Sequence, residues 1–393
     1  MKGQLLSAAV IAAGGLTCIA DGAELLVPQQ YPTIQAGIDA AEPGDVVIVA
    51  DGTYTGQGNR DITFDGKAIT VRSAGGPTVC IIDCAGTQQN PHRGFYFGSG
   101  ETNASVVEGF TICNGSTPPG AVLDEFNGAG IMINNGSSPT IRNCIIRNNW
   151  AGCWGGAISC GWVAEAQPVI DRCVIVNNFA GDEGGGLFAV GANPTVINTV
   201  IANNEAGTAG GGILSLGGGS FTIRNSTIIL NSAPWAGGVY DWNGTVTNSI
   251  IRGNNGDGQA FNTLGSVTYS NIEGGFDGVG NVDVDPMLLN PARGDVHLLP
   301  GSPMIDAGDP SFVPAQGELD MDGNSRLVGL GVDMGADELL LIGDINEDGV
   351  VGVTDLLGLL SAWGPCAGCN ADLNADQVVN VLDLLLLISN WSG

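Results

Sequence analysis

The stretch SPTIRNCIIRNN, residues 138–149, recurs along the chain in closely similar form. Its relatives are QPVIDRCVIVNN at 167–178, NPTVINTVIANN at 193–204 and SFTIRNSTIILN at 220–231, with a shorter TVTNSIIRGNN at 245–255. Repeats with a period of roughly 20 to 50 residues are the sequence signature of solenoids and related arrays. This repeated stretch therefore decides the fold class.

Each unit carries an asparagine by which we align the repeats. After it come a glycine-rich turn and a second apolar run, such as GAISC at 156–160 and GLFAV at 186–190. The asparagines are 23 to 29 residues apart, and variable spacing between constant motifs indicates fixed strands joined by adjustable loops. We predict two short strands per coil, with Gly or Asn at the corners. The aligned asparagines are Asn148, Asn177, Asn203, Asn231 and Asn254.

Such coils predict an all-β fold, a single-stranded parallel β-helix of about ten coils, with neighbouring strands about 4.8 Å apart. Inward side chains then form columns, and the aligned asparagines are expected to hydrogen-bond along one of them. A second column is aliphatic and contributes to the core. Its members are Ile141, Ile170, Val196, Ile223 and Val246.

Both ends of the stack need covering, because bare strand edges aggregate. At the front, YPTIQAGIDAAEPGD at 31–45 predicts a short capping helix that begins at Thr33 and ends near Pro43 and Gly44. At the rear, we expect the acidic, irregular stretch 283–338 to cap the last coil.

Two segments resemble known families. PTIQAGIDAAEPGDVVIVADGTY at 32–54 resembles the opening of pectin-lyase-like bacterial β-helix proteins, whose right-handed repeats the coil motifs also resemble. DPMLLNPARGDVHLLPGSPMIDAGD at 285–309, with VDMGADE at 332–338, resembles the closing region of secreted choice-of-anchor β-helix proteins. The resemblance implies a right-handed β-helix over residues 21–340 and a separate attachment module after it. Fold alone licenses no reaction.

Two twelve-residue loops near the end of the chain, DINEDGVVGVTD at 344–355 and DLNADQVVNVLD at 372–383, carry oxygen ligands at the spacing of a calcium loop. We therefore predict two calcium ions in a module of residues 341–393. The first loop offers Asp344, Asn346, Asp348, Asp355 and the Val350 carbonyl. The second offers Asp372, Asn374, Asp376, Asn380, Asp383 and the Val378 carbonyl. Gly352 removes one side-chain ligand, and Gln377 replaces the turn glycine at a cost of about 1 kcal/mol.

Each loop leads into a leucine-rich segment that predicts an amphipathic helix packed against its twin. A loop followed by one helix, duplicated and with Asp at position 12, resembles type I dockerins, small EF-hand-type α-helical domains. The resemblance implies docking to a cohesin-like receptor through Val353, Thr354, Val381 and Leu382. A compact calcium-stabilised tail stays open as an alternative.

Composition excludes some partners and indicates export. Asp and Glu number 40 against 12 Lys and Arg, for a net charge of −28, so nucleic acid would be repelled. Lys2 and the apolar run 5–20 predict a bacterial signal peptide over residues 1–20, cleaved after Ala20. No later segment is long and apolar enough to span a membrane. We expect a secreted protein, extracellular or on the cell surface.

The cysteines allow several pairings. Removal of Cys18 with the signal peptide leaves nine, an odd number. Cys144 and Cys173 occupy equivalent positions and are expected to be stacked thiols. Loop staples between Cys153 and Cys160, or between Cys80 and Cys84, stay open. For Cys366 and Cys369, a local disulfide or pairing with a partner is favoured over zinc.

Catalytic residues stay unassigned. The GHG and RIK motifs of polygalacturonase-like sites are absent, and the only histidines are His92 and His297. A lyase needs Arg or Lys beside calcium-binding acids. Arg142 and Asp171 are expected instead to form an exposed ion pair between neighbouring coils. The acidic residues at 320–324 and 283–285 either hold a further calcium ion or fix loops.

Tryptophans cluster in the coil turns between residues 150 and 242. Trp162 belongs to the same group. If exposed, these tryptophans form a platform for sugar rings; if buried, they fill the corners of the solenoid. The predicted platform is Trp150, Trp154, Phe179, Trp235 and Trp242. The favoured function is a calcium-binding, non-catalytic protein associated with extracellular polysaccharide. A calcium-dependent polysaccharide lyase and a structural surface fibre or adhesin are the alternatives.

Overall fold

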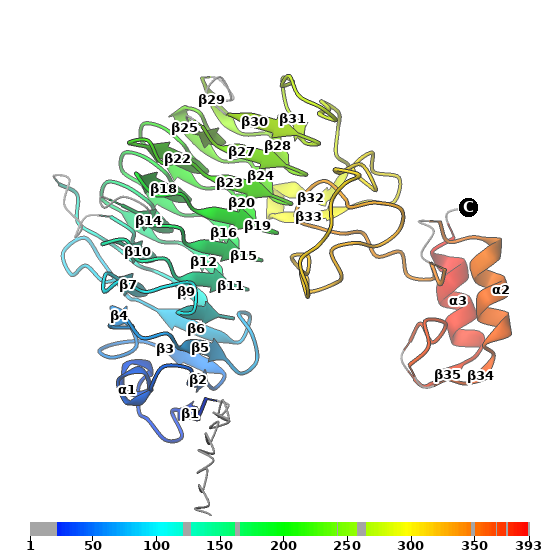
Figure 1. Cartoon of the computed structure of the whole chain (residues 1–393), viewed down its shortest axis with the longest axis horizontal. Helices are drawn as coiled ribbons and strands as arrows, with labels where there is room; N and C mark the ends of the chain where they lie inside the picture. Colours follow the sequence, from blue (N-terminus) through cyan, green and yellow to red (C-terminus); the bar gives the residue numbers. More distant parts are fainter. Residues whose placement is uncertain are drawn as a thin grey trace, which may run out of the picture.

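The strands of the protein stack in register as a parallel β-helix (Figure 1). The structure is a computed structural model that describes residues 22–120, 127–161, 166–241, 243–257, 265–346, 350–366, 368–374 and 376–391. The expected signal peptide, Trp162, Trp242 and Asp348 lie outside these residues. The predicted fold class is confirmed.

Sheet A is a ten-stranded sheet with one strand from each coil, which agrees with the expected number of coils. The aliphatic column runs along its inner face as predicted, because Ile141 pairs with Ile170 and all five members are buried. The strands in stacking order are β1 (Glu24–Val27), β2 (Val46–Val49), β5 (Thr70–Ser73), β8 (Val106–Glu108), β11 (Thr140–Arg142), β15 (Val169–Asp171), β19 (Thr195–Ile197), β23 (Thr222–Arg224), β27 (Thr245–Thr247) and β30 (Ser266–Thr268).

Three further parallel sheets complete the coils. Sheet B consists of β3 (Gly52–Tyr54), β6 (Cys80–Asp83), β9 (Thr111–Cys113), β12 (Ile145–Arg147), β16 (Val174–Val176), β20 (Val200–Ala202), β24 (Thr227–Ile229), β28 (Ile250–Arg252) and β31 (Asn271–Ile272). Sheet C consists of β4 (Ile62–Thr63), β7 (Phe95–Phe97), β10 (Ile131–Ile133), β14 (Ile158–Cys160), β18 (Leu187–Val190), β22 (Ile213–Leu216) and β26 (Val239–Tyr240). Sheet D consists of β13 (Trp150–Ala151), β17 (Phe179–Ala180), β21 (Glu205–Ala206), β25 (Ser232–Trp235) and β29 (Asn255–Asp257). Central coils therefore have four strands, and the prediction of two was wrong because each repeated stretch bends once inside the motif.

The asparagine column exists, but our alignment of it was wrong by one residue in three coils. The buried ladder consists of Asn149, Asn178, Asn204, Asn231 and Asn254. Each of the first four amide nitrogens donates to the next amide oxygen at 2.9 to 3.0 Å. Each also donates to a backbone carbonyl, as Asn204 does to Ile175 at 2.9 Å. This buried polar network is satisfied along its length.

Asn148, Asn177 and Asn203 instead form the corner just before the ladder. Their φ angles are 57°, 56° and 55°, in the left-handed region that asparagine tolerates better than most residues. A second corner column separates sheets A and B, and Asn143, Asn198 and Asn225 are among its members. The adjacent asparagines of the motif thus have different tasks: the first turns the chain and the second points inward.

The front of the stack is closed by α1 (Ile34–Ala40), as predicted. The hydroxyl of Thr33 accepts a hydrogen bond from the Ala36 N–H at 3.2 Å and so caps the helix. Gly37 permits close approach to the first coils, since a Cβ atom there would lie 2.9 Å from Val47 Cγ1. The helix ends three residues earlier than Pro43.

The rear end is closed by the turn 274–282, and the stretch 283–338 does not cap it. Phe276 packs against the main core, and the Asn281 amide hydrogen-bonds to Ser270 and Val267 of the last coil. The following chain, including β32 (Leu288–Asn290), the 3-10 helix η2 (Pro291–Arg293) and β33 (Asp295–Leu298), folds back along the side of the stack (Figure 1).

We call residues 283–338 the lateral cover. Its Val296 and Ala336 pack on Val200, Ala202 and Ile229 of sheet B. These strands are apolar on both faces, so their outer face needs a covering layer. Polar contacts fix the register of the cover, including the Ala336 N–H, which donates to the Thr227 hydroxyl at 3.0 Å. The segment predicted to cap the rear end covers the side of the stack instead, because the apolar outer face of sheet B would otherwise be exposed to water.

The C-terminal module has its own small core. It contains α2 (Val353–Ser361), α3 (Val381–Ser389) and the antiparallel pair β34 (Gly364–Pro365) and β35 (Val378–Val379). Val351 and Leu359 of the first repeat pack with Val379 and Leu387 of the second. No helix in the described part of the chain is long and apolar enough to cross a membrane.

Candidate functional site

Sheet D and the turns after it form one side of the stack, which we call the aromatic flank. In a first column, Trp150 lies beside Phe179 of the next coil. The second column consists of Trp154, Glu183, Ala209 and Trp235, one from each successive coil. The structure therefore brings four of the five predicted platform residues to one side, and the fifth, Trp242, lies outside the described residues.

The aromatic side chains on this flank are partly corner fillers and partly a platform. Trp150 and Phe179 stack with ring centroids 5.7 Å apart. Trp154 stacks at 4.9 Å on Phe188, which is buried. Trp150, Phe179 and Trp154 are half-buried, whereas Trp235 is 64% exposed. The two alternatives for the tryptophans thus both apply, at different positions.

Acidic side chains lie between the aromatic ones. Glu183 separates Trp154 from Trp235 in the second column, and Asp182 and Glu205 are exposed nearby. Burial, and then the charge of Asp182, raises the pKa of Glu183. The flank therefore offers carboxylate oxygens and aromatic faces together.

An open pocket of about 320 Å³ adjoins the flank. The bridge between Ser116 and Trp150 joins the two surfaces. The pocket is lined by Asp61, Thr63, Pro91, His92, Arg93, Tyr96, Ser116 and Thr117. Sequence reasoning missed this pocket, because its residues come from different coils and share no repeated motif.

The pocket holds an oriented imidazole. Nδ1 of His92 lies 2.6 Å from Asp61 Oδ2, while the other oxygen of Asp61 accepts the Arg93 N–H at 2.9 Å. No residue in the described part of the chain hydrogen-bonds to His92 Nε2. The Arg93 guanidinium lies 5.9 Å from the centre of the Tyr96 ring. A histidine held through one nitrogen can donate or accept a proton through the other.

Arg142 and Asp171 do not pair, although they are neighbours in the predicted register. Arg142 Nη2 binds Glu108 Oε2 of the preceding coil at 2.8 Å. Asp171 lies 3.6 Å from Arg172 Nε, and its pKa is raised because burial outweighs that neighbour. The predicted pair does not form because Arg142 has a carboxylate in both neighbouring coils, Glu108 in the preceding one and Asp171 in the next, and it binds Glu108.

The second predicted calcium loop gathers oxygen-bearing side chains around one turn. Asp372 accepts the Gln377 N–H at 2.7 Å, and Asp376 accepts the Val378 N–H at 2.9 Å. Gln377 has a φ of 71°, the left-handed conformation expected where glycine is usual. The side chains present carry only oxygen and amide groups, which fits a hard cation such as calcium.

Position 12 of each loop is a buried carboxylate that accepts hydrogen bonds from the backbone. Asp355 accepts the N–H groups of Ile345 and Gly352, both at 2.8 Å. For Asp383, burial alone would raise the pKa, but N–H donors including Asn380 outweigh it, and the pKa lies below its usual range. Inward-facing carboxylates at this position fit the calcium prediction, which stays a prediction.

The helices of the module have apolar residues on two faces. Leu359 and Leu387 pack inward, as predicted. Other apolar residues of the two helices face away from this core. Val353, Leu357, Leu360 and Trp363 of the first repeat, and Val381, Leu382, Leu385, Ile388 and Trp391 of the second, are exposed. The predicted docking residues, Thr354 included, all lie on the surface.

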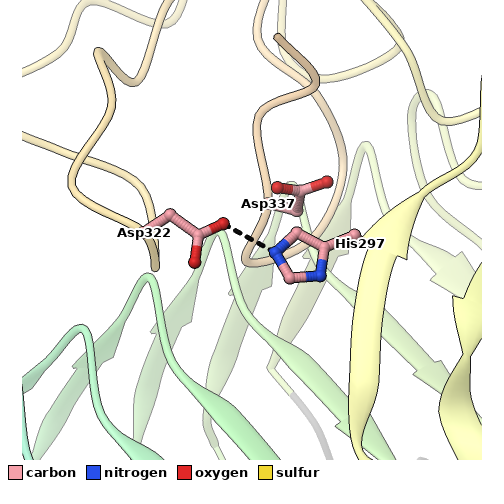
Figure 2. A group of neighbouring side chains, drawn as sticks. All are labelled: His297, Asp322 and Asp337. Atoms are coloured by element: carbon pink, nitrogen blue, oxygen red, sulfur yellow. Dashed lines mark hydrogen bonds and ion pairs between the residues drawn. The ribbon is translucent and has the colours of Figure 1, made fainter. Parts of the chain in front are cut away.

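A histidine and two aspartates meet at the edge of the lateral cover (Figure 2). His297 lies on β33, whereas Asp322 and Asp337 come from two later loops. Asp322 hydrogen-bonds to His297 Nε2 at 2.7 Å, and Asp295 to Nδ1. Hydrogen bonding to Asp322, and then to Asp295, raises the pKa of His297 to about 10.

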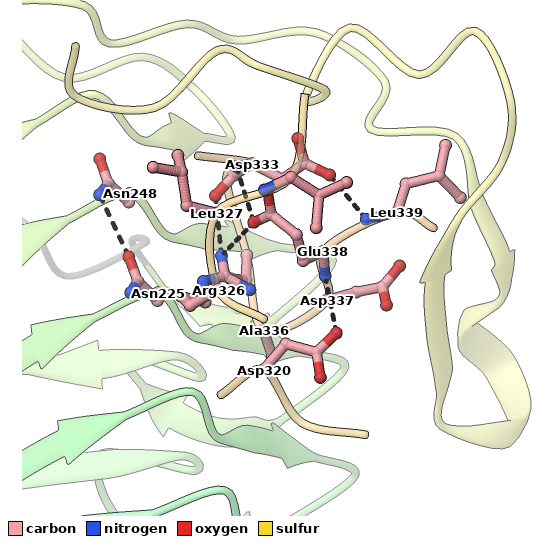
Figure 3. A network of polar contacts seen from close by, with 12 residues as sticks. Asn225, Asn248, Asp320, Arg326, Leu327, Asp333, Ala336, Asp337, Glu338 and Leu339 are labelled. Atoms are coloured by element: carbon pink, nitrogen blue, oxygen red, sulfur yellow. Dashed lines mark hydrogen bonds and ion pairs between the residues drawn. The ribbon is translucent and has the colours of Figure 1, made fainter. Parts of the chain in front are cut away.

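A buried ionic network lies behind this cluster (Figure 3). Arg326 is fully buried and donates to the carbonyls of Asp333 and Gly335 at 2.9 and 2.7 Å. Its guanidinium lies 3.8 Å from Glu338, whose pKa is raised to about 8 by burial and then by Asp333. Asp320 accepts the N–H of Asn324 at 2.7 Å and so fixes the turn formed by residues 320–324, while calcium binding there stays a prediction.

Cys366 and Cys369 form the expected local disulfide. The described cysteines of the β-helix are free and buried, including the stacked pair Cys144 and Cys173. Neither loop staple forms: Cys153 donates instead to the Gly120 carbonyl at 2.8 Å, and Cys160 lies inside the core. Burial raises the pKa of Cys160 to about 12, so this thiol is unreactive.

Comparison with known proteins supports the fold. Residues 47–228 match the family model described as a right handed beta helix region. The chain is a right-handed parallel β-helix. No curated protein matches it significantly.

Two solved structures are similar at low identity. The crystal structure of pectate lyase Pel9A matches with a TM-score of 0.42 and 16% identity, over 78% of this chain and 90% of that chain. The structure of rice weevil pectin methyl esterase matches with a TM-score of 0.34 and 13% identity, over 68% and 80%. Neither likeness is close enough to carry an inference about activity.

Proposed function

We propose that the protein is a secreted, polysaccharide-associated protein whose aromatic flank binds a neutral glycan chain without turning it over. The supporting observation is the column that aligns Trp154, Glu183 and Trp235 along the stack. Because coils repeat about every 4.8 Å, Trp154 and Trp235 lie about 14 Å apart along the axis. An extended chain of several sugar rings can follow such a column.

The charge of the flank favours a neutral polysaccharide over a uronate polymer. Asp182, Glu183 and Glu205 would repel sugar carboxylates, but they accept hydrogen bonds from sugar hydroxyls. The chain as a whole carries a net charge of −28, which adds to this repulsion. Aromatic faces supply the apolar contact that sugar rings need.

Affinity electrophoresis of the whole protein through gels that contain neutral or uronate polysaccharides tests the proposal. We expect retardation by a neutral polymer, and a loss of roughly 2-fold to 13-fold in affinity for Trp235→Ala, from about 0.5 to 1.5 kcal/mol per aromatic contact. Trp363→Ala, an exposed tryptophan of the C-terminal module, serves as the matched control. The proposal fails if no polymer retards the protein or if both variants behave alike.

We further propose that the C-terminal module binds two calcium ions and attaches the protein to a cohesin-like receptor. The support is the pair of loops with only oxygen-bearing ligands and the exposed apolar residues beside them, Val353 and Val381 among them. An exposed apolar surface of this kind is typical of a protein interface. Export through the predicted signal peptide would bring the module to an extracellular receptor.

A second candidate function is supported by the His92 pocket. Histidine, arginine and carboxylate line one cavity beside the flank, and lyases use a basic residue to abstract a sugar proton. We propose a calcium-dependent polysaccharide lyase as the alternative. Uronate polymers incubated with calcium and the protein would then gain the absorbance of unsaturated ends, and His92→Gln would abolish the gain. Absence of turnover by the natural protein on a broad panel eliminates this alternative.

A further inference from the structure

The His297 cluster carries an inference that is independent of the glycan flank and of the calcium loops. We propose that His297, Asp322 and Asp337 bind one divalent transition-metal ion of the zinc class. The ligands are Nε2 of His297 and one oxygen of each aspartate. The ion would lie at the outer edge of the lateral cover, where the three residues meet (Figure 2).

Convergence of three separate segments is the first argument. One ligand atom from each of the three residues lies within 4.8 Å of the others, although the residues are far apart in sequence. The side chains of His297 and Asp322 are 40% and 41% exposed, whereas Asp337 is buried. A bound ion would therefore have protein ligands on its inner side and water on its outer side, the arrangement of an open metal site.

Orientation of the ligands is the second argument. Asp295 Oδ1 binds Nδ1 of His297, which directs Nε2 toward Asp322 and Asp337. A carboxylate on the remote nitrogen is the usual partner of a metal-binding histidine, because it fixes the ring and makes Nε2 more basic. Asp337 is likewise held, since one of its oxygens accepts the Leu298 N–H at 2.7 Å. Its other oxygen is available to an ion.

The ligand set discriminates between metals. Calcium takes oxygen ligands, whereas an imidazole nitrogen with carboxylates suits zinc, cobalt or manganese. On binding, Nε2 loses its proton to solvent, and its hydrogen bond to Asp322 is replaced by a bond from each residue to the ion. The metal ion and the proton therefore compete for Nε2, and the three nearby carboxylates supply the negative charge that a dication needs.

A bound ion would join three parts of the lateral cover. His297 belongs to β33, Asp322 to the turn fixed by Asp320, and Asp337 to the segment that packs on sheet B through Ala336. Crosslinking these parts would hold the cover against the stack. The protein would then gain thermal stability with rising metal concentration.

Cobalt provides a direct test, because its visible absorption reports the ligands. The whole protein is titrated with Co²⁺ in excess calcium, and Zn²⁺ is then added to displace it. We expect one cobalt ion per chain at this site, with visible absorption that is lost in His297→Gln and in Asp322→Asn. Asp295→Asn, which alters only the orienting partner, should weaken binding by about 10-fold to 100-fold.

The controls separate metal binding from folding and from the calcium loops. His92→Gln removes the other histidine, which also contacts an aspartate, and should leave the cobalt spectrum unchanged. Asn at position 322 can still accept the His297 hydrogen bond, so near-ultraviolet circular dichroism should show an intact cover. The proposal is overturned if the natural protein gives no cobalt spectrum, or if the spectrum survives in both His297→Gln and Asp322→Asn.

Discussion

At the residue scale, the asparagine ladder shows how one side chain can serve several coils. The amide of Asn204 accepts from Asn178 and donates to Asn231, and it also donates to the Ile175 carbonyl. Buried amides of this kind stabilise the stack only while every group has a partner. The adjoining Asn203 turns the chain with a φ of 55° and takes no part in the ladder.

Substitution of a ladder asparagine should therefore be costly. We expect Asn204→Ala to lower the free energy of unfolding by about 2 kcal/mol or more, because it removes the acceptor of the buried Asn178 N–H and a donor to the Ile175 carbonyl. Asn203→Gly should change it by less than about 0.5 kcal/mol, because glycine adopts the same left-handed backbone. Urea denaturation of both variants, followed by circular dichroism, measures the difference. Equal midpoints would show that the ladder is not important for stability.

At the scale of an element, the lateral cover is held to the stack by charge as well as by apolar packing. Glu318 binds Arg224 of β23 at 2.7 Å and is almost fully buried in this contact. Burial alone would raise the pKa of Glu318, but the Ala315 N–H and Arg224 outweigh it and lower the pKa below 4.5. Asn225 and, at longer range, Asp171 also face this carboxylate.

Acid should loosen the cover at this contact. A depressed folded-state pKa means that the stabilising contribution is present above pH 4.5 and is lost as the pH falls through the lower folded-state value. Hydrogen exchange between pH 7 and pH 3 should show residues near Glu318 losing protection on acidification. In Glu318→Gln, protection should already be weaker at pH 7 and should change less with pH. Glu42→Gln, at the other end of the stack, should match the natural protein throughout.

At the scale of the whole molecule, the β-helix and the C-terminal module have separate cores. The core of the stack contains none of the residues that form the core of the module. In Figure 1, α2 and α3 stand apart from the coils. We therefore expect a condition that unfolds one of the two parts to leave the other folded.

Removal of calcium should affect the module alone. With a chelator, we expect proteases to cleave within residues 341–393, because the carboxylates of each loop would repel one another without a cation. In protein purified free of transition metals, the thermal transition of the β-helix should stay unchanged. Excess calcium should restore resistance in the natural protein but not in Asp376→Ala. Equal cleavage with and without calcium would contradict the calcium prediction.

The sequence alone determined the repeat, the aliphatic column from Ile141 to Val246, the cap of α1 at Thr33 and the pattern of oxygen ligands in the C-terminal loops. Each of these depends on residues that are near in sequence or that recur at a regular interval. Periodicity shows which residues are equivalent, but two adjacent asparagines leave open which one points inward.

Three features appear only in the folded chain: Asn149 rather than Asn148 joins the ladder, residues 283–338 cover the side of the stack, and His92 meets Asp61. The same holds for His297 with Asp322 and Asp337. These contacts join residues that no repeat relates, and their positions follow from how the coils and the cover pack in three dimensions. Packing of distant segments depends on the complete surface that each presents, which no short stretch of sequence contains.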